Sequence, residues 1–293
     1  MAGGVPGMLN QTGKDTMALT VNTNLASMNT VAKVNQTNKG LQKTLGRISS
    51  GLRINSAADD AAGLGVAENL DAASRSMNQA MRNTNDGISV VQTAEGAANE
   101  VANIIKRMRE LAVQSASETL DNGERAYIQD EFAQLSEEVD RIANVTEFNG
   151  TALADGTNAT INVQVGINNT ADDQIAITLG DLTAATLGVN TAAINLGTAT
   201  GASAALPALD TALDSVNAYR SEFGAVQNRL ESSLRNLENT DQNLAAAESQ
   251  IRDADFAQEA SEMAKYQVMQ QAGVAALSQA KNINQAAAQL LQS

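Results

Sequence analysis

The sequence predicts a mainly α-helical protein: a long antiparallel helical coiled-coil bundle formed by the two chain ends, with a small β-hairpin region in the middle. Proline occurs only as Pro6 and Pro207, so the strongest helix breaker is absent from residues 7–206. Apolar residues recur at every seventh position through much of the last third of the chain, which is typical of a helix packed against a partner helix. Aromatic residues make up only 2% of the chain, too few for an ordinary globular core. Together these features favour long, slender helices that pack through small side chains.

The first half of the chain contains three expected helices. The first covers about residues 24–52, and its apolar side chains follow steps of three, four and seven. A polar link at residues 55–60 leads to a second helix that reaches about Ala112. A turn at residues 120–123 then leads to a third helix, which ends near residue 148. The apolar seam of the first helix consists of Val31, Val34, Leu41, Leu45 and Ile48.

The middle of the chain, about residues 150–205, carries a hairpin signal. Apolar residues alternate with polar ones from Ile161 to Val165 and again from Ile175 to Leu179. A turn-rich loop lies between these two runs, so they predict two antiparallel strands. Residues 180–205 are rich in Thr, Ala and Gly, and we expect further short strands or loops there.

The last third holds the clearest periodicity of the chain. A seven-residue apolar repeat sustained over this length predicts a partner helix, because a narrow apolar stripe is not satisfied alone. Pro207 is expected in the first turn of this helix, where its missing N–H is tolerated. The core seam consists of Leu209, Val216, Phe223, Leu230, Leu237, Leu244 and Ile251.

A weaker amphipathic stretch follows residue 256 and forms the second terminal seam, with Ala276, Ala280, Ile283 and Leu290. The elements are therefore arranged symmetrically about the β region, which predicts that the chain folds back on itself there.

Four segments follow from this symmetry. Residues 1–16 are expected to be an N-terminal extension that is disordered. Residues 17–57 and 254–293 are expected to be the two parts of an inner terminal helical domain. Residues 58–253 are expected to form a core domain that contains the long helices and the β region.

Composition excludes several classes of function. The net charge of -14 disfavours nucleic acid or an anionic membrane as a partner. The chain has no Cys and no His, so thiolate chemistry and the commonest general base and metal ligand are missing. Asp59 and Asp60 lie where a helix begins, and we interpret them as solvated capping residues instead of metal ligands. No run of about 18 apolar residues exists, so we expect no membrane span. From the missing Cys and His we expect no cofactor, no metal site and no enzymatic activity.

The two outer segments, about residues 17–53 and 256–293, have short seams built largely from Ala, Val and Met. A buried Val or Leu contributes about 1.5–3 kcal/mol, whereas ordering costs about 1–2 kcal/mol per residue. An isolated helix pair of this kind is only marginally stable, so its helices are expected to become ordered when copies of the chain cover them. The pattern by itself leaves a second interpretation open, in which these seams are ordinary bundle core. Non-closing contacts between copies would give an open helical filament.

Several motifs in a fixed order resemble those of bacterial flagellin, the filament subunit of the flagellum. The resemblance covers about residues 17–150 and 206–292. The motifs are MALTVNTN at 17–24, RISSGLRINSAADDAAG at 47–63, RELAVQS at 109–115, EFNG at 147–150, FGAVQNRL at 223–230 and QQAG at 270–273.

This resemblance implies a subunit that polymerises with itself into the hollow, helical filament used for swimming, here in a short form without large outer domains. It implies a secreted, extracellular location, reached by flagellar type III export. The partners it implies are a flagellin export chaperone at the C-terminal segment, filament cap and hook-junction proteins, and a host flagellin-sensing Toll-like receptor. The implied receptor contacts, for which subunit packing is the plainer interpretation, are Arg107, Leu111, Gln114 and Glu131. A hook–filament junction protein of the same family is the alternative.

Overall fold

A computed structural model describes the backbone of residues 23–290 and the side chains of residues 23–282. The expected extension at residues 1–16 lies outside the described part. The chain divides into two compact units. We call residues 1–64 with 251–293 the terminal unit, and residues 65–250 the central unit.

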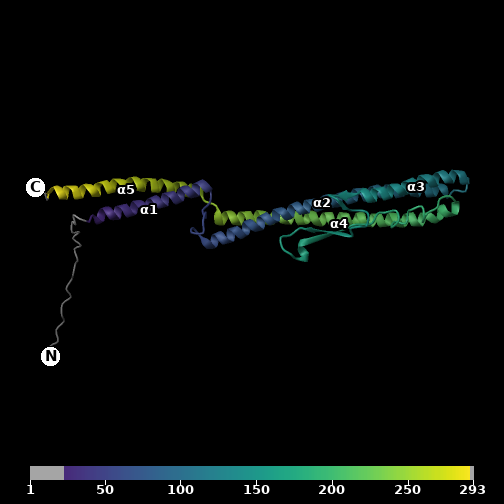
Figure 1. The fold of residues 1–293 in the computed structure, drawn as a ribbon, viewed down its shortest axis with the longest axis horizontal. Coiled ribbons are helices and arrows are strands. Elements are labelled where there is room, and N and C mark those ends of the chain that lie inside the picture. Colours follow the sequence, from purple (N-terminus) through teal and green to yellow (C-terminus); the bar gives the residue numbers. More distant parts are fainter. Residues whose placement is uncertain (1–22, 291–293) are drawn as a thin grey trace, which may run out of the picture. The chain divides into compact units, whose positions relative to one another are not determined.

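The terminal unit is built from two long helices, one from each end of the chain. Helix α1 is Leu25–Ser50 and helix α5 is Phe256–Leu290, and they pack side by side (Figure 1). The Asn24 side chain caps α1 by accepting a hydrogen bond from the backbone N–H of Ser27 at 2.8 Å. Helix α1 ends at Gly51, which has a φ of 72° and donates its N–H to the Arg47 carbonyl.

Backbone hydrogen bonds join the segment that follows α1 to the segment that precedes α5. Leu52 and Asp253 form an antiparallel bridge. The N–H of Arg53 donates to the Arg252 carbonyl at 2.7 Å, and the N–H of Ala254 donates to the Gly51 carbonyl at 2.9 Å. Two segments separated by about 200 residues in sequence are thereby held together at the base of the α1–α5 pair.

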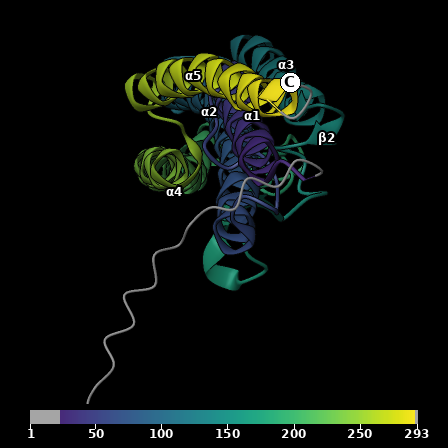
Figure 2. The same cartoon turned by 90° about the vertical axis from the view of Figure 1, so that its left-hand side faces the viewer.

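Three helices dominate the central unit: α2 (Ala61–Ser115), α3 (Asn122–Val145) and α4 (Ala199–Arg252). Figure 2 shows α4 end-on. Helix α3 begins with a capping box, in which the Asp121 carboxylate accepts from the N–H of Glu124 and the Glu124 carboxylate accepts from the N–H of Asp121.

The expectation that Pro207 lies in the first turn of the last long helix is wrong. Helix α4 begins at Ala199, eight residues earlier, so Pro207 lies inside it. Its side chain is exposed while Ala202, Ala205 and Leu209 around it are buried. We infer that burial of this face holds the extra turns in spite of the hydrogen bond that proline cannot donate.

Two small antiparallel strand pairs occupy the middle of the chain. Strands β1 (Glu147–Phe148) and β2 (Thr151–Ala152) form one pair, and β3 (Thr160–Gln164) and β4 (Gln174–Thr178) form the other. In the second pair Ile161 lies opposite Ile177 and Val163 opposite Ile175, so the predicted alternation and hairpin are confirmed. A short 3-10 helix, η1 (Ala171–Asp173), lies in the hairpin loop. The predicted fold class is confirmed as well.

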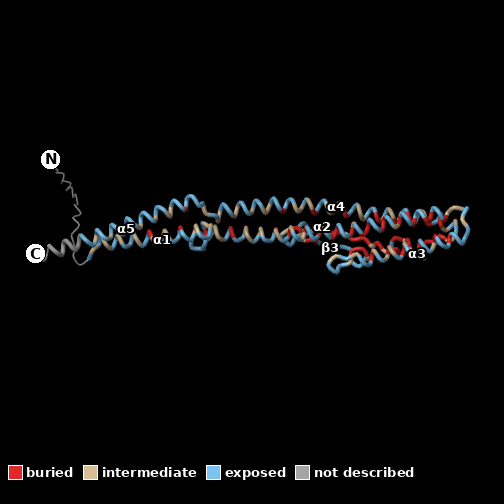
Figure 3. The backbone as a smooth tube through the Cα atoms, turned by 90° about the horizontal axis from the view of Figure 1, so that it is seen from above, coloured by how far each residue is buried: buried red, intermediate tan, exposed pale blue. Residues whose placement is uncertain are grey.

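The hydrophobic core lies in the central unit. Figure 3 shows the buried positions concentrated there, where α2, α3, α4 and the strands share one cluster. The scarcity of aromatic residues is compensated by two phenylalanines, since Phe132 on α3 and Phe223 on α4 are at most 2% exposed. Fully buried alanines such as Ala98, Ala102 and Ala112 allow α2 to pack closely against its neighbours.

Candidate assembly surface

The seven-residue seam of α4 is buried over most of its length. Its first four members are at most 2% exposed, and the fifth is 9% exposed. The last two are half-buried. In chain order these residues are Leu209, Val216, Phe223, Leu230, Leu237, Leu244 and Ile251.

The terminal seam has a different character, because none of its described members is buried. Val31 and Leu45 are 42% and 46% exposed. Ala276 is exposed as well, and Val34, Leu41, Ile48 and Ala280 are half-buried. The side chains of Ile283 and Leu290 lie outside the described part. Burial on α1 and α5 is instead confined, among described side chains, to Thr37, Thr44 and Glu259.

Large apolar side chains are exposed along both terminal helices. Eight of the thirteen exposed large hydrophobic residues in the described part of the chain belong to α1 or α5. Their exposed fractions run from 40% to 65%. Apolar surface gathered on two adjacent helices indicates an interaction surface. These residues are Leu25, Met28, Val31, Leu45, Phe256, Val268, Met269 and Val274.

Two glycines let the terminal helices approach closely. A Cβ added at Gly40 of α1 would lie 2.6 Å from the nearest atom of the Tyr266 ring on α5. A Cβ added at Gly273 of α5 would lie 2.7 Å from a methyl carbon of Val34 on α1. Both distances are shorter than real carbon contacts, so a side chain at either glycine would force Tyr266 or Val34 to move or the helices to separate.

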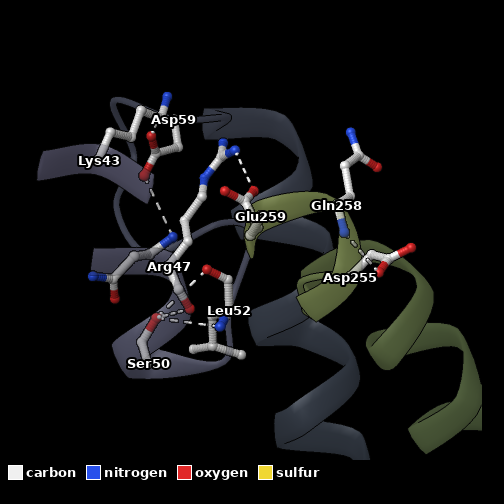
Figure 4. A network of polar contacts seen from close by, with 9 residues as sticks. Lys43, Arg47, Ser50, Leu52, Asp59, Asp255, Gln258 and Glu259 are labelled. Atoms are coloured by element: carbon white, nitrogen blue, oxygen red, sulfur yellow. Dashed lines mark hydrogen bonds and ion pairs between the residues drawn. The ribbon is translucent and has the colours of Figure 1, made fainter. Parts of the chain in front are cut away.

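Polar groups connect α1 and α5 along their length. The Asn24 amide donates to the Ala280 carbonyl at 3.0 Å, and the Gln270 amide donates to Asn38 Oδ1 at 2.8 Å. Nearer the base of the pair, Arg47 Nη1 donates to Glu259 Oε1 at 2.9 Å. Figure 4 shows Arg47 reaching from α1 to this carboxylate on α5.

Lys43 on α1 forms a second ion pair, with Asp59 in the link that follows the helix. The Lys43 Nζ lies 2.7 Å from Asp59 Oδ1. Hydrogen bonding by this ammonium is the main reason that the pKa of the Asp59 carboxyl falls from 3.8 to about 2, and the Ser56 hydroxyl contributes in the same direction.

This shift gives a testable pH dependence. A carboxyl whose pKa is lower in the folded state stabilises that state when ionised, so its contribution is complete above about pH 4 and is lost as the pH falls through about 2. We expect NMR titration of the Asp59 carboxyl carbon to give a pKa below 3, and Lys43→Gln to raise it toward 3.8. An unshifted pKa in the unmodified chain would contradict the ion pair.

The four candidate receptor contacts lie on α2 and α3 of the central unit. Arg107 pairs with Glu131 at 2.8 Å and with Glu110 at 3.0 Å. Gln114 is exposed. Leu111 is 1% exposed and belongs to the core, so its side chain serves packing within one copy.

Sequence patterns did not reveal two buried charged residues. Glu259 is 7% exposed and Arg125 is 7% exposed. Arg125 donates to the carbonyls of Ser115 at 3.0 Å and Ser117 at 2.7 Å, so it ties the turn between α2 and α3 to the start of α3. A charged residue in a helical sequence is normally interpreted as solvated, and its periodicity gives no sign of a partner far away in the chain.

The described residues contain no cluster of three or more metal-binding side chains. No helix among them is long and apolar enough to cross a membrane.

A buried central bundle combined with paired terminal helices that expose apolar side chains defines a helical structural protein suited to self-association. The family model for the bacterial flagellin N-terminal helical region matches residues 21–159, and the model for the C-terminal helical region matches residues 206–291. The chain belongs to the bacterial flagellin family. It is a structural subunit of the flagellar filament and not an enzyme.

Two relatives are similar in sequence over nearly the whole chain. A flagellin of Halalkalibacterium halodurans is 46% identical over 272 residues, which cover 92% of this chain and 99% of that protein. A flagellin of Bacillus subtilis is 39% identical over 303 residues, with the same two coverages. The crystal structure of Bacillus cereus flagellin covers 57% of this chain and 94% of its own, with 32% identity and a TM-score of 0.47. The alternative of a hook–filament junction protein gains no better support from these comparisons.

Proposed function

We propose that α1 and α5 form the surface through which copies of this subunit join, and that the two helices become fully ordered when neighbouring copies cover them. The observation that carries this proposal is the exposure of eight large apolar side chains on these helices. Such side chains gain free energy when they leave water, at about 25 cal/mol per Å² of apolar surface.

The energetics of an isolated α1–α5 helix pair support this dependence on neighbouring copies. No large apolar side chain described on α1 or α5 is buried. Without that burial, little favourable free energy offsets a backbone ordering cost of about 1–2 kcal/mol per residue. Helices in this situation are marginal in water. Contact with several copies supplies the missing apolar burial, so ordering and polymerisation are coupled.

The remaining partners follow from the same surface. We infer that an export chaperone binds the C-terminal segment before secretion, because α5 exposes Phe256, Val268 and Val274. Secretion by the flagellar type III apparatus, and contacts with cap and hook-junction proteins at the ends of the filament, complete the proposal.

For the flagellin-sensing receptor, Arg107, Gln114 and Glu131 on α2 and α3 are the accessible candidates. We further propose residues 17–57 with 254–293 as one inner domain and 58–253 as the core domain.

Removal of residues 256–293 tests the assembly surface. We expect the truncated chain to stay folded in its central unit, because the core cluster lies entirely within residues 90–230. We also expect it to form no filaments. Circular dichroism melting checks the fold, and sedimentation with electron microscopy after addition of filament seeds checks polymerisation. Filaments grown from the truncated chain would refute the role of α5.

The same seeded assay separates the two roles within the family. The full chain is expected to extend seeds into long tubes. A junction protein would instead add a short segment and stop.

A further inference from the structure

Apart from the fits of Tyr266 against Gly40 and of Val34 against Gly273, the apolar contacts between α1 and α5 define the register of this helix pair only weakly. The described seam side chains are half-buried or exposed, and two of them are alanines. Elsewhere along the seam, a slip of α5 by one turn would exchange one partly exposed apolar contact for another. Such seams normally need polar or charged contacts to select one register.

The pairing of α1 with α5 nevertheless follows a single antiparallel register. Contacts join Asn24 to Ala280, Asn38 to Gln270, and Arg47 to Glu259. From Asn24 to Arg47 the residue number on the α1 side rises by 23, and the number of the partner on α5 falls by 21. The first two contacts involve neutral amides, and the third involves two charges.

The charged contact is the one of the three that has a buried member. The Glu259 side chain is 9% exposed and the Arg47 side chain is 25% exposed. Glu259 Oε2 and Arg47 Nε are both buried and have no hydrogen-bond partner among the described protein residues. In Figure 4 the nearby Lys43 pairs with Asp59, and Asp255 accepts from the N–H of Gln258. Arg47 is therefore the cation that Glu259 depends on.

We propose that the Arg47–Glu259 ion pair is a register-determining contact between α1 and α5, alongside the steric fits at Gly40 and Gly273, and that it positions the assembly surface that copies of the chain share. A slip of one turn would separate Glu259 from Arg47. It would either leave the buried carboxylate without a cation or bring it to Lys43, which already pairs with Asp59, and both are more unfavourable than exchanging one small apolar contact for another. A buried ion pair contributes little net stability compared with apolar packing, but it penalises every alternative pairing. The assembly part of this inference rests on the proposed function, whereas the register part does not.

The absence of cysteine from the chain permits a direct test by disulfide cross-linking. Asn38→Cys with Gln270→Cys reports the observed register, because these two side chains are hydrogen-bonded. Asn38→Cys with Val274→Cys reports a register displaced by one turn of α5. The ratio of intrachain disulfide yields gives the preference for the observed register. It is measured by mass spectrometry on the monomers recovered after oxidised, seeded filaments, in which α1 and α5 are covered by neighbouring copies, are depolymerised.

Charge reversal then isolates the ion pair. Arg47→Glu alone and Glu259→Arg alone are each expected to lower the yield ratio by about tenfold or more. The double variant, which exchanges the two charges, is expected to restore it. Lys39→Glu is the matched control, since it makes the same change of charge at an exposed position of α1, and it should leave the ratio unchanged.

Seeded polymerisation of the same variants, without the added cysteines, tests whether the ion pair positions the assembly surface. Each single reversal is expected to reduce the sedimented fraction, and the exchanged pair is expected to recover it. An unchanged yield ratio in the single variants, or no recovery in the exchanged pair, would overturn the register role. Recovery of the ratio without recovery of polymerisation would overturn the link to assembly. Failure of the proposed function itself would show separately, as filament growth from the chain that lacks residues 256–293.

Discussion

Phe132→Ala is expected to lower the free energy of unfolding of the central unit by about 3–5 kcal/mol, because a fully buried ring is removed and the surroundings close only partly over the cavity. Phe132 is 0% exposed and belongs to the cluster shared by α2, α3, α4 and the strands. In a chain with only four phenylalanines, few other side chains of this volume are available to fill the space. Urea unfolding followed by circular dichroism measures the change.

Tyr127→Ala provides the control on the same helix. Tyr127 is 78% exposed, so its loss should change the free energy of unfolding by less than about 0.5 kcal/mol. Equal effects at the two positions would contradict the assignment of Phe132 to the core.

Leu230→Asp should have an effect of similar size or larger, about 3–5 kcal/mol or more, because it adds an unpaired carboxylate to a buried site. Leu230 is 0% exposed and lies in the same cluster as Phe223 and Val226. We expect the central unit to lose cooperative thermal unfolding at neutral pH. Loss of the near-ultraviolet circular dichroism signal would accompany this change.

Two further variants calibrate this result. Asn228→Asp adds the same charge at an exposed neighbouring position and should leave the melting temperature nearly unchanged. Leu244→Asp places the charge two heptads further along the seam, where the side chain is only half-buried, so its effect should be intermediate. A thermal unfolding curve of the Leu230→Asp variant that matches that of the parent chain would refute the buried position of this seam.

The seam of α4 shows what sequence periodicity alone can and cannot predict. A repeat of seven predicts which face of the helix is apolar, because side-chain direction depends only on the local helical geometry. It does not predict that Leu209 is fully buried while Leu244 is half-exposed. That difference depends on how many elements surround each position, and α3 and the strands join the core cluster beside the first part of the seam.

The terminal helices show the complementary case. Their short, alanine-rich seams indicated marginal stability, and the exposed apolar side chains agree with that interpretation. The pairing of Arg47 with Glu259 was beyond sequence reasoning, because these residues are separated by 212 positions and each looks like an ordinary solvated charge.

The sequence by itself determined the helical class, the hairpin and the family, since these depend on local periodicity, turn residues and ordered motifs. Only the tertiary structure decided that α4 begins at Ala199, that Leu111 and Arg125 are buried, and that one ion pair joins α1 to α5. Burial and partnership are properties of packing between segments far apart in the chain, and no local pattern encodes them.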